Sequence, residues 1–221
     1  MPGRLHYIGK LSGAQAPESV SGSFELLRLT LARQEATASA NEWPQDEAAR
    51  QWLSGWYTSL PALTSPGGVY GDAQAAGFAD EVFQLLNAER IDKSHTPLKR
   101  DPHLDAVAQA HARQMAEAGF FDHANPQGLQ VFERIDAIGA PRWYTAGENI
   151  AAGYQTPQAA HQGWMDSRGH KKNIRNEQYR YVGIGAYHAP QTELGWYWVQ
   201  VFASFDSDPA QHDWIEPGER H

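Results

Sequence analysis

Residues 196–203 read Trp-Tyr-Trp-Val-Gln-Val-Phe-Ala, and this short stretch decides the class of fold that we expect. Successive side chains of a strand point to opposite faces of its sheet. One face then carries Tyr197, Val199, Val201 and Ala203, and the other carries Trp196, Trp198, Gln200 and Phe202. Because both faces are mostly apolar, the pattern predicts a strand that is covered on both sides.

Helices are predicted from apolar residues that recur every three or four positions earlier in the chain. The expected helices span residues 75–90, 102–118, 131–139 and 157–168. A second strand is expected over residues 181–187, where Gly183 and Gly185 leave room for a neighbouring element to approach closely. Helices combined with strands that are buried on two faces predict an α+β fold, a three-layer α-β-α sandwich.

Several polar residues mark the ends and attachments of these helices. Asp101 followed by Pro102 is typical of a helix start, and Gly119 is typical of a helix end. Asn87 and Arg90, near the end of the first helix, are expected to tie that helix to a loop.

The chain divides into three parts. The breaker cluster at residues 65–68 separates an N-terminal extension, residues 1–72, from a main domain, residues 73–205, and residues 206–221 form a polar tail. The extension is predicted to be partly helical, and its pattern leaves the rest of its structure open. It is rich in tryptophan, and we expect Trp43, Trp52 and Trp56 to pack against the main domain.

Composition excludes several classes of function. The 221 residues carry 18 Lys+Arg against 26 Asp+Glu, a formal net charge of −8, without the basic cluster that nucleic-acid binding requires. No run of about 20 apolar residues is present, so no transmembrane segment is predicted. The absence of cysteine excludes disulfides, thiol nucleophiles and cysteine-based zinc sites. No signal peptide is visible in residues 1–11, which leaves open either a cytoplasmic protein or an exported one whose leader has been removed.

Three short segments stand out as candidates for a site. They place His123 in a loop after a helix end, Glu148 between a glycine and an apolar run, and His170 after a glycine at the end of a helix. Their separation in sequence means that only the fold can bring them together. We assign no chemical role to most of the ten histidines, including His6 and His111, because they have no partner at the spacing of metal ligands.

A family resemblance gives these segments a meaning. The chain contains, in order, Leu86-Asn87-Ala88-Glu89-Arg90, Pro97-Leu98, Asp101, His123, Gly147-Glu148-Asn149-Ile150, Trp164-x-x-Ser167-x-Gly169-His170-x-x-Asn173-Ile174, Val182-Gly183-Ile184-Gly185 and Tyr197-Trp198-Val199-Gln200-Val201-Phe202. This series resembles the CAP superfamily of cysteine-rich secretory, antigen 5 and pathogenesis-related 1 proteins, in its cysteine-free bacterial branch. The resemblance covers residues 78–205, and the extension has no counterpart in it.

The resemblance implies an α-β-α sandwich with a central cavity lined by two histidines and two acids, which in several members binds zinc or another divalent cation. His123 takes the place of the first histidine, Glu148 that of the first acid and His170 that of the second histidine. The position of the second acid is occupied by Ser167. Asp166 beside it is expected to point elsewhere, about 100° round the helix.

A site with one carboxylate is expected to hold a divalent cation such as zinc only weakly. The candidate cavity-lining residues are Ser167, Asp166, Asn149 and Asn173, and the two asparagines are expected to satisfy buried backbone groups near the cavity. A purely structural role also stays open, in which Glu148 only ties the loop by hydrogen bonds.

Two functions follow from the resemblance. The first is a secreted or cell-envelope binding or interaction module for a small apolar ligand, a lipid, a cell-wall component or a protein partner. The alternative is a metal-dependent, peptidase-like hydrolase that uses His123 and His170 as metal ligands and Glu148 as a ligand or base. A scaffold that docks a partner through the Trp-rich extension is a third possibility. The sequence leaves open whether the protein is an enzyme.

Overall fold

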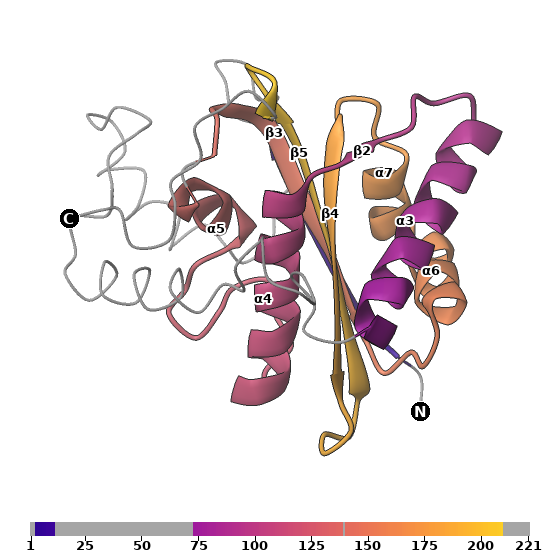
Figure 1. The fold of residues 1–221 in the computed structure, drawn as a ribbon, viewed down its shortest axis with the longest axis vertical. Helices are drawn as coiled ribbons and strands as arrows, with labels where there is room; N and C mark the ends of the chain where they lie inside the picture. Colours follow the sequence, from indigo (N-terminus) through magenta and orange to yellow (C-terminus); the bar gives the residue numbers. More distant parts are fainter. Residues whose placement is uncertain (1–2, 12–72, 139, 210–221) are drawn as a thin grey trace.

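The fold is a five-stranded sheet between two layers of helices, as the computed structural model shows for residues 3–11, 73–138 and 140–209 (Figure 1). The strand order is β1-β3-β5-β4-β2, antiparallel except for the short β2–β4 pair. The strands are β1 (Arg4–Leu11), β2 (Lys99–Arg100), β3 (Trp143–Ala152), β4 (Tyr181–Ala189) and β5 (Gly195–Phe205). The helices are α3 (Ala73–Asp92), α4 (Pro102–Ala118), α5 (Val131–Ala137), α6 (Pro157–Asp166) and α7 (Arg168–Ile174).

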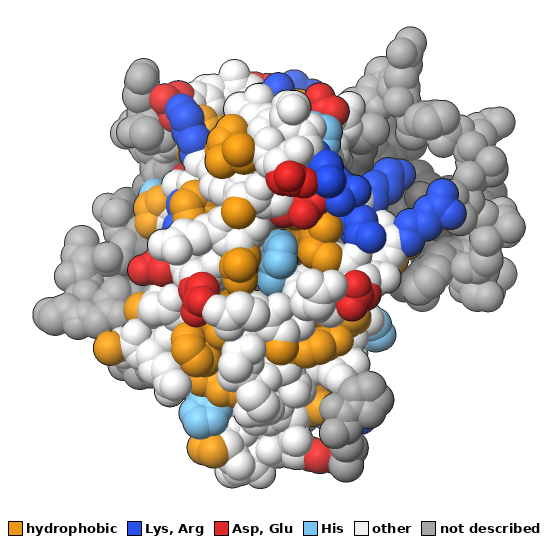
Figure 2. All heavy atoms as spheres, turned by 90° about the vertical axis from the view of Figure 1, so that its right-hand side faces the viewer, with side chains coloured by type: hydrophobic (Ala, Val, Ile, Leu, Met, Phe, Trp, Pro, Cys, Tyr) orange, Lys and Arg blue, Asp and Glu red, His pale blue; other side chains and the backbone are white. Residues whose placement is uncertain are grey.

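Helices α4 and α5 cover one face of the sheet, and α3, α6 and α7 cover the other (Figure 1). The predicted three-layer sandwich is therefore confirmed. The surface of the α3–α6–α7 layer mixes charged side chains of both signs with small apolar patches, as expected of a face that meets solvent (Figure 2). Trp43, Trp52 and Trp56 lie outside the described residues.

Strand β5 has the two buried faces that its sequence predicts. Tyr197, Val199, Val201, Ala203 and Phe205 belong to the core on the α4–α5 side. Trp196, Trp198 and Phe202 belong to the core on the α3–α6 side, where Trp198 is completely buried. Complete burial of one large apolar side chain stabilises a fold by roughly 1.5–3 kcal/mol, so this strand is central to stability.

Helix α4 lies unusually close to β4. A Cβ added to Gly183 would lie 2.0 Å from the carbonyl carbon of Leu104, so only glycine permits this approach. The closeness lets Asp105 accept a hydrogen bond from Ile184 N (2.7 Å), and Gln109 accept one from Ala186 N (2.8 Å). The two side chains thereby accept hydrogen bonds from backbone amides of β4 that lie beyond the end of β2, where β2 no longer pairs with β4.

The ends of α4 follow the sequence, α3 extends two residues further at each end than expected, and α5 ends at Ala137. Asp101 caps α4 by accepting hydrogen bonds from two backbone amides, and Gly119 closes it with φ 70°. The helix that we expected over residues 157–168 instead ends at Asp166, because Ser167 takes an extended conformation and a new helix, α7, starts at Arg168. This break turns His170 toward the sheet. Asn87 and Arg90 bind backbone groups of the loop at Thr96–Leu98, as expected.

Strand β1 comes from the N-terminal part of the chain, which we predicted to be an extension outside the main domain. Residues 4–11 pair with β3 along eight positions, from Arg4 opposite Ala152 to Leu11 opposite Thr145. The sheet of the main domain therefore includes a strand that precedes residue 73. Its sequence gives little sign of this, because its apolar residues do not alternate cleanly and its partner lies far along the chain.

Candidate ligand-binding site around Glu148

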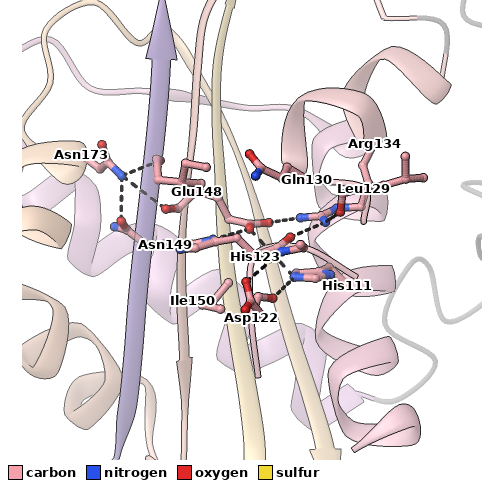
Figure 3. A network of polar contacts seen from close by, with 12 residues as sticks. His111, Asp122, His123, Leu129, Gln130, Arg134, Glu148, Asn149, Ile150 and Asn173 are labelled. Atoms are coloured by element: carbon pink, nitrogen blue, oxygen red, sulfur yellow. Dashed lines mark hydrogen bonds and ion pairs between the residues drawn. The ribbon is translucent and has the colours of Figure 1, made fainter. Parts of the chain in front are cut away.

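Glu148 lies at the centre of the site, fully buried on β3, and both of its carboxylate oxygens are engaged (Figure 3). Oε2 accepts a hydrogen bond from Arg134 Nη2 at 2.6 Å, and Oε1 lies 2.7 Å from His123 Nδ1. Arg134, on α5, also donates through Nη1 to the carbonyl oxygens of His123 (2.8 Å) and Leu129 (2.9 Å). Arg134 thus fixes the backbone of the His123 loop, while Glu148 fixes the imidazole ring.

The charge of Glu148 is set by its buried neighbours. Burial raises the pKa of the carboxyl, but the charge of Arg134 and the hydrogen bond with His123 outweigh it and lower the pKa to about 2. Glu148 is therefore a carboxylate at any physiological pH. Because a carboxylate can only accept, the proton of a neutral His123 lies on Nδ1, and its Nε2 presents a lone pair.

His111 joins this cluster in a supporting role. The ring is completely buried on α4, with Nε2 3.0 Å from the carbonyl oxygen of Asp122 and 4.0 Å from Glu148 Oε1. Burial and then Arg134 lower the pKa of His111 to about 3, so the ring is neutral. It supports the loop that carries His123.

His170 is held in a similar way from the other side of the sheet. Its Nδ1 lies 2.7 Å from Ser167 Oγ, across the break between α6 and α7. Burial lowers the pKa of His170 to about 4, although the backbone of His6 acts in the opposite direction. The Nε2 atoms of His123 and His170 are both buried, and neither has a hydrogen-bond partner among the described residues.

Strand β1 contributes two residues to the surroundings of the site, His6 and Tyr7. The His6 ring lies 5.1 Å from the Phe121 ring and 6.0 Å from the His123 ring. The next residue, Tyr7, points to the other face and meets the edge of the His170 ring at 5.2 Å. Burial, followed by the neighbouring His123, lowers the pKa of His6.

The two asparagines join α7 to the sheet by their side-chain amides. Asn173 Nδ2 lies 3.1 Å from Ile8 O, 3.3 Å from Glu148 O and 3.0 Å from Asn149 Oδ1. Asn149 donates in turn to the carbonyl oxygen of His170 and to Gln200. Asp166 is exposed, accepts a hydrogen bond from Gln162 and takes no part in the site.

The residues fit a divalent cation only in part. The two unpaired Nε2 atoms are suitable ligands, and they are the atoms that would hold an ion. Glu148 does not fit as a ligand, because Arg134 and His123 occupy its two oxygens. Within residues 3–11, 73–138 and 140–209, no group of three or more His, Asp or Glu side chains is arranged to hold a metal ion. A weakly held cation stays a prediction.

The sequence of this domain is similar to those of a known protein family and of two bacterial proteins. Residues 83–202, just over half of the chain, match the model of the cysteine-rich secretory protein family, CAP. YkwD of Bacillus subtilis strain 168 is 35% identical over 130 residues, which are 59% of this chain and 48% of YkwD. The membrane protein YlbC of the same organism is 31% identical over 105 residues, 48% of this chain and 30% of YlbC. The matched region thus covers less than half of either relative.

One solved structure is similar in both sequence and fold. It is an extracellular protein that contains an SCP domain, from Bacillus anthracis strain Ames, with 31% sequence identity and a TM-score of 0.51. The match covers 58% of this chain and 41% of the other. In the described part of this chain, no helix has both the length and the apolar character needed to cross a membrane.

Proposed function

This chain belongs to the cysteine-rich secretory protein family, and we propose that it is an extracellular or cell-envelope binding module whose ligand contacts Nε2 of His123 and of His170. The observation that carries the proposal is that both atoms are buried without a partner among the described residues. A buried polar atom without a hydrogen bond costs about 1–3 kcal/mol. A fold that keeps two such atoms buried is therefore suited to a ligand that pairs with them.

The two rings differ in what they offer a ligand. In a neutral His123, Glu148 holds the proton on Nδ1 and Nε2 is an acceptor. Ser167 Oγ can donate to or accept from His170, so that ring can take either tautomer. A group that accepts and a group that either donates or accepts together suit a hydroxyl or amide, as in the sugars and peptides of cell-wall fragments. With both Nε2 atoms unprotonated, the same pair suits a weakly held divalent cation.

A hydrolase is the less favoured function for two reasons. A carboxylate with a pKa of about 2, held by Arg134 and His123, is a weak general base near neutral pH. Ser167 pairs with His170, but within the described residues no carboxylate hydrogen-bonds that ring to orient it. Binding needs neither of these features.

An extracellular location is also part of the proposal. It is supported by the similar Bacillus anthracis protein, which is extracellular.

The test is a titration of the full chain by calorimetry, first with zinc and then with soluble muropeptides. Saturable binding that is lost in the His123→Ala/His170→Ala variant and kept in His188→Ala, a control at an exposed histidine, would support the site. Zinc should be carried to about 1 mM, where even weak sites fill. Failure of both probes to bind, or equal binding by the double variant, would overturn the proposal.

A further inference from the structure

We propose that β1 is an exchangeable strand: the edge of β3 is a peptide-binding groove that residues 4–11 fill from within the chain. On release of β1, the groove admits an extended peptide with an aromatic residue at the position of Tyr7, and the His123–His170 site opens. The proposal deepens the proposed function, since it concerns access to the same site.

The groove has a backbone wall and a helical rim. β1 pairs with β3 at eight successive positions and has no strand on its other side within the described residues. From the rim, α7 adds a hydrogen bond, because Asn173 Nδ2 donates to Ile8 O at 3.1 Å. Main-chain pairing of this kind binds any extended segment, and side-chain pockets then select among them.

A glycine on α7 makes the pocket for the aromatic ring. A Cβ added to Gly169 would lie 1.9 Å from Tyr7 Cε1, and the three nearest atoms all belong to the Tyr7 ring. The ring also meets His170 edge-on. Glycine is unfavourable within a helix by about 0.5–1 kcal/mol relative to alanine. At position 169 this cost is offset, because the missing side chain leaves room for the Tyr7 ring.

The strand covers the site on both faces of the sheet. His6 lies against His123, and Tyr7 lies against His170, because successive side chains of a strand alternate. A ligand that approaches from the open edge of the sheet meets β1 before it meets either Nε2 atom. Removal of the strand would uncover both histidines at once.

The strand is attached more weakly than its neighbours. The Tyr7 side chain is 54% exposed, His6 and Gly9 are exposed, and Leu5 and Ile8 are only half-buried, whereas β3 is buried almost throughout. A strand with few buried apolar contacts opens at a lower free energy than the core of the sheet. Its main-chain hydrogen bonds are the part that another peptide would replace.

The first experiment follows hydrogen exchange in the full chain. We expect amides of β1 to exchange at least about 100-fold faster than amides shared by β4 and β5, as for local rather than global opening. Gly169→Ala should speed β1 exchange further by crowding Tyr7. Gly77→Ala is the matched control, because Gly77 is exposed on α3 and no atom outside its own helix lies within 4 Å of the added Cβ. It should leave the exchange of β1 unchanged. Protection of β1 equal to that of β5 would overturn the proposal.

The second experiment measures binding of a labelled peptide with the sequence of residues 3–11. Replacing both Tyr7 and Ile8 by proline in the full chain removes at least one ladder N–H, whichever of the two residues donates it. The peptide should bind this variant saturably. A peptide that carries Tyr7→Ala should bind at least about tenfold more weakly, because it loses the contacts of the ring with Gly169 and His170.

These readouts separate the two proposals. Peptide binding by the proline variant without any zinc or muropeptide binding would leave the groove standing and remove the proposed function. Absence of peptide binding to a proline variant with native near-ultraviolet circular dichroism would overturn the groove. If that variant loses its native spectrum, the exchange rates of the wild-type β1 decide.

Discussion

Arg134 Nη2 lies 2.6 Å from Glu148 Oε2, and neither side chain is exposed to solvent. This ion pair joins α5 to β3, and the same two residues hold the backbone and the ring of His123. The orientation of His123 therefore depends on a buried charge that Arg134 balances. Glu148 acts as a positioning residue, because its two oxygens are directed to protein groups.

Replacement of Arg134 by methionine should destabilise the protein strongly. The change leaves the Glu148 carboxylate buried without its cation, and removal of one partner of a buried pair costs about 3–5 kcal/mol. Urea unfolding at pH 7 measures the loss. Arg113→Met is the control, because Arg113 pairs with Glu117 on the exposed surface of α4, and we expect a cost below about 1 kcal/mol. Equal costs for the two variants would show that Glu148 does not depend on Arg134.

Stability should fall as the pH is lowered from 6.5, through protonation of His111 and His170. The pKa of each is lowered in the folded protein, to about 3 and about 4, from the ordinary value of 6.5. The unfolded chain therefore binds protons first, and the stabilisation that is complete above pH 6.5 is lost progressively below it. His111→Gln should make the unfolding free energy less dependent on pH between 6.5 and 4. An unchanged pH dependence in that variant would contradict a neutral buried His111.

Asp105 should make the protein less stable, not more stable, as the pH rises from 4 to 6. Burial raises its pKa from 3.8 to about 6, despite Arg100 at 2.8 Å, so the folded protein favours the protonated form. Ionisation then costs stability as the pH rises from 4 through 6. Relative to the wild type, Asp105→Asn should gain stability over that rise, because it stays neutral and keeps an acceptor for Ile184 N. A relative loss would mean that the ion pair with Arg100 outweighs burial.

The fold was predictable because its signals are local, and the site was only partly so. β5 shows its two apolar faces within eight residues, and Asp101 and Gly119 mark the ends of α4 without help from tertiary structure. His123, Glu148 and His170 came from the resemblance, since nothing in their spacing brings them together. That they act together as ligands stays a prediction.

The residues that sequence reasoning missed are those whose role depends on distant partners. An isolated arginine on a helix is usually exposed, and Arg134 is buried only because Glu148 lies beneath it. His111 lies in the apolar stripe of α4, and a polar residue in such a stripe was the available signal. The sequence of β1 carries a still weaker signal, because the pairing register of this strand is set by β3 rather than by its own apolar pattern.

The close packing of α4 on β4 should make Gly183 the least replaceable of the strand glycines. Gly183→Ala would place its Cβ 2.0 Å from backbone atoms of Leu104, which cannot move without shifting the helix. Such overpacking typically costs about 1–3 kcal/mol and here should reach the upper end. Thermal unfolding compares it with Gly77→Ala, which should be neutral or slightly stabilising. If the two variants melt together, α4 does not approach β4 as closely as described.

Loss of the Ser167 hydroxyl should change the tautomer ratio of His170 and leave that of His123 unaltered. Ser167→Ala removes the hydroxyl that lies 2.7 Å from His170 Nδ1, so the ring loses the partner that orients it. In metal sites, loss of such a hydrogen-bond partner of a histidine ligand lowers metal affinity about 10–100-fold. Nitrogen NMR of the imidazoles should then show an altered tautomer ratio for His170 and an unaltered one for His123, which Glu148 holds. Ser167→Thr keeps the hydroxyl and is the control. Equal His170 spectra in all three proteins would show that the ring is fixed by its packing against Tyr7 and not by Ser167.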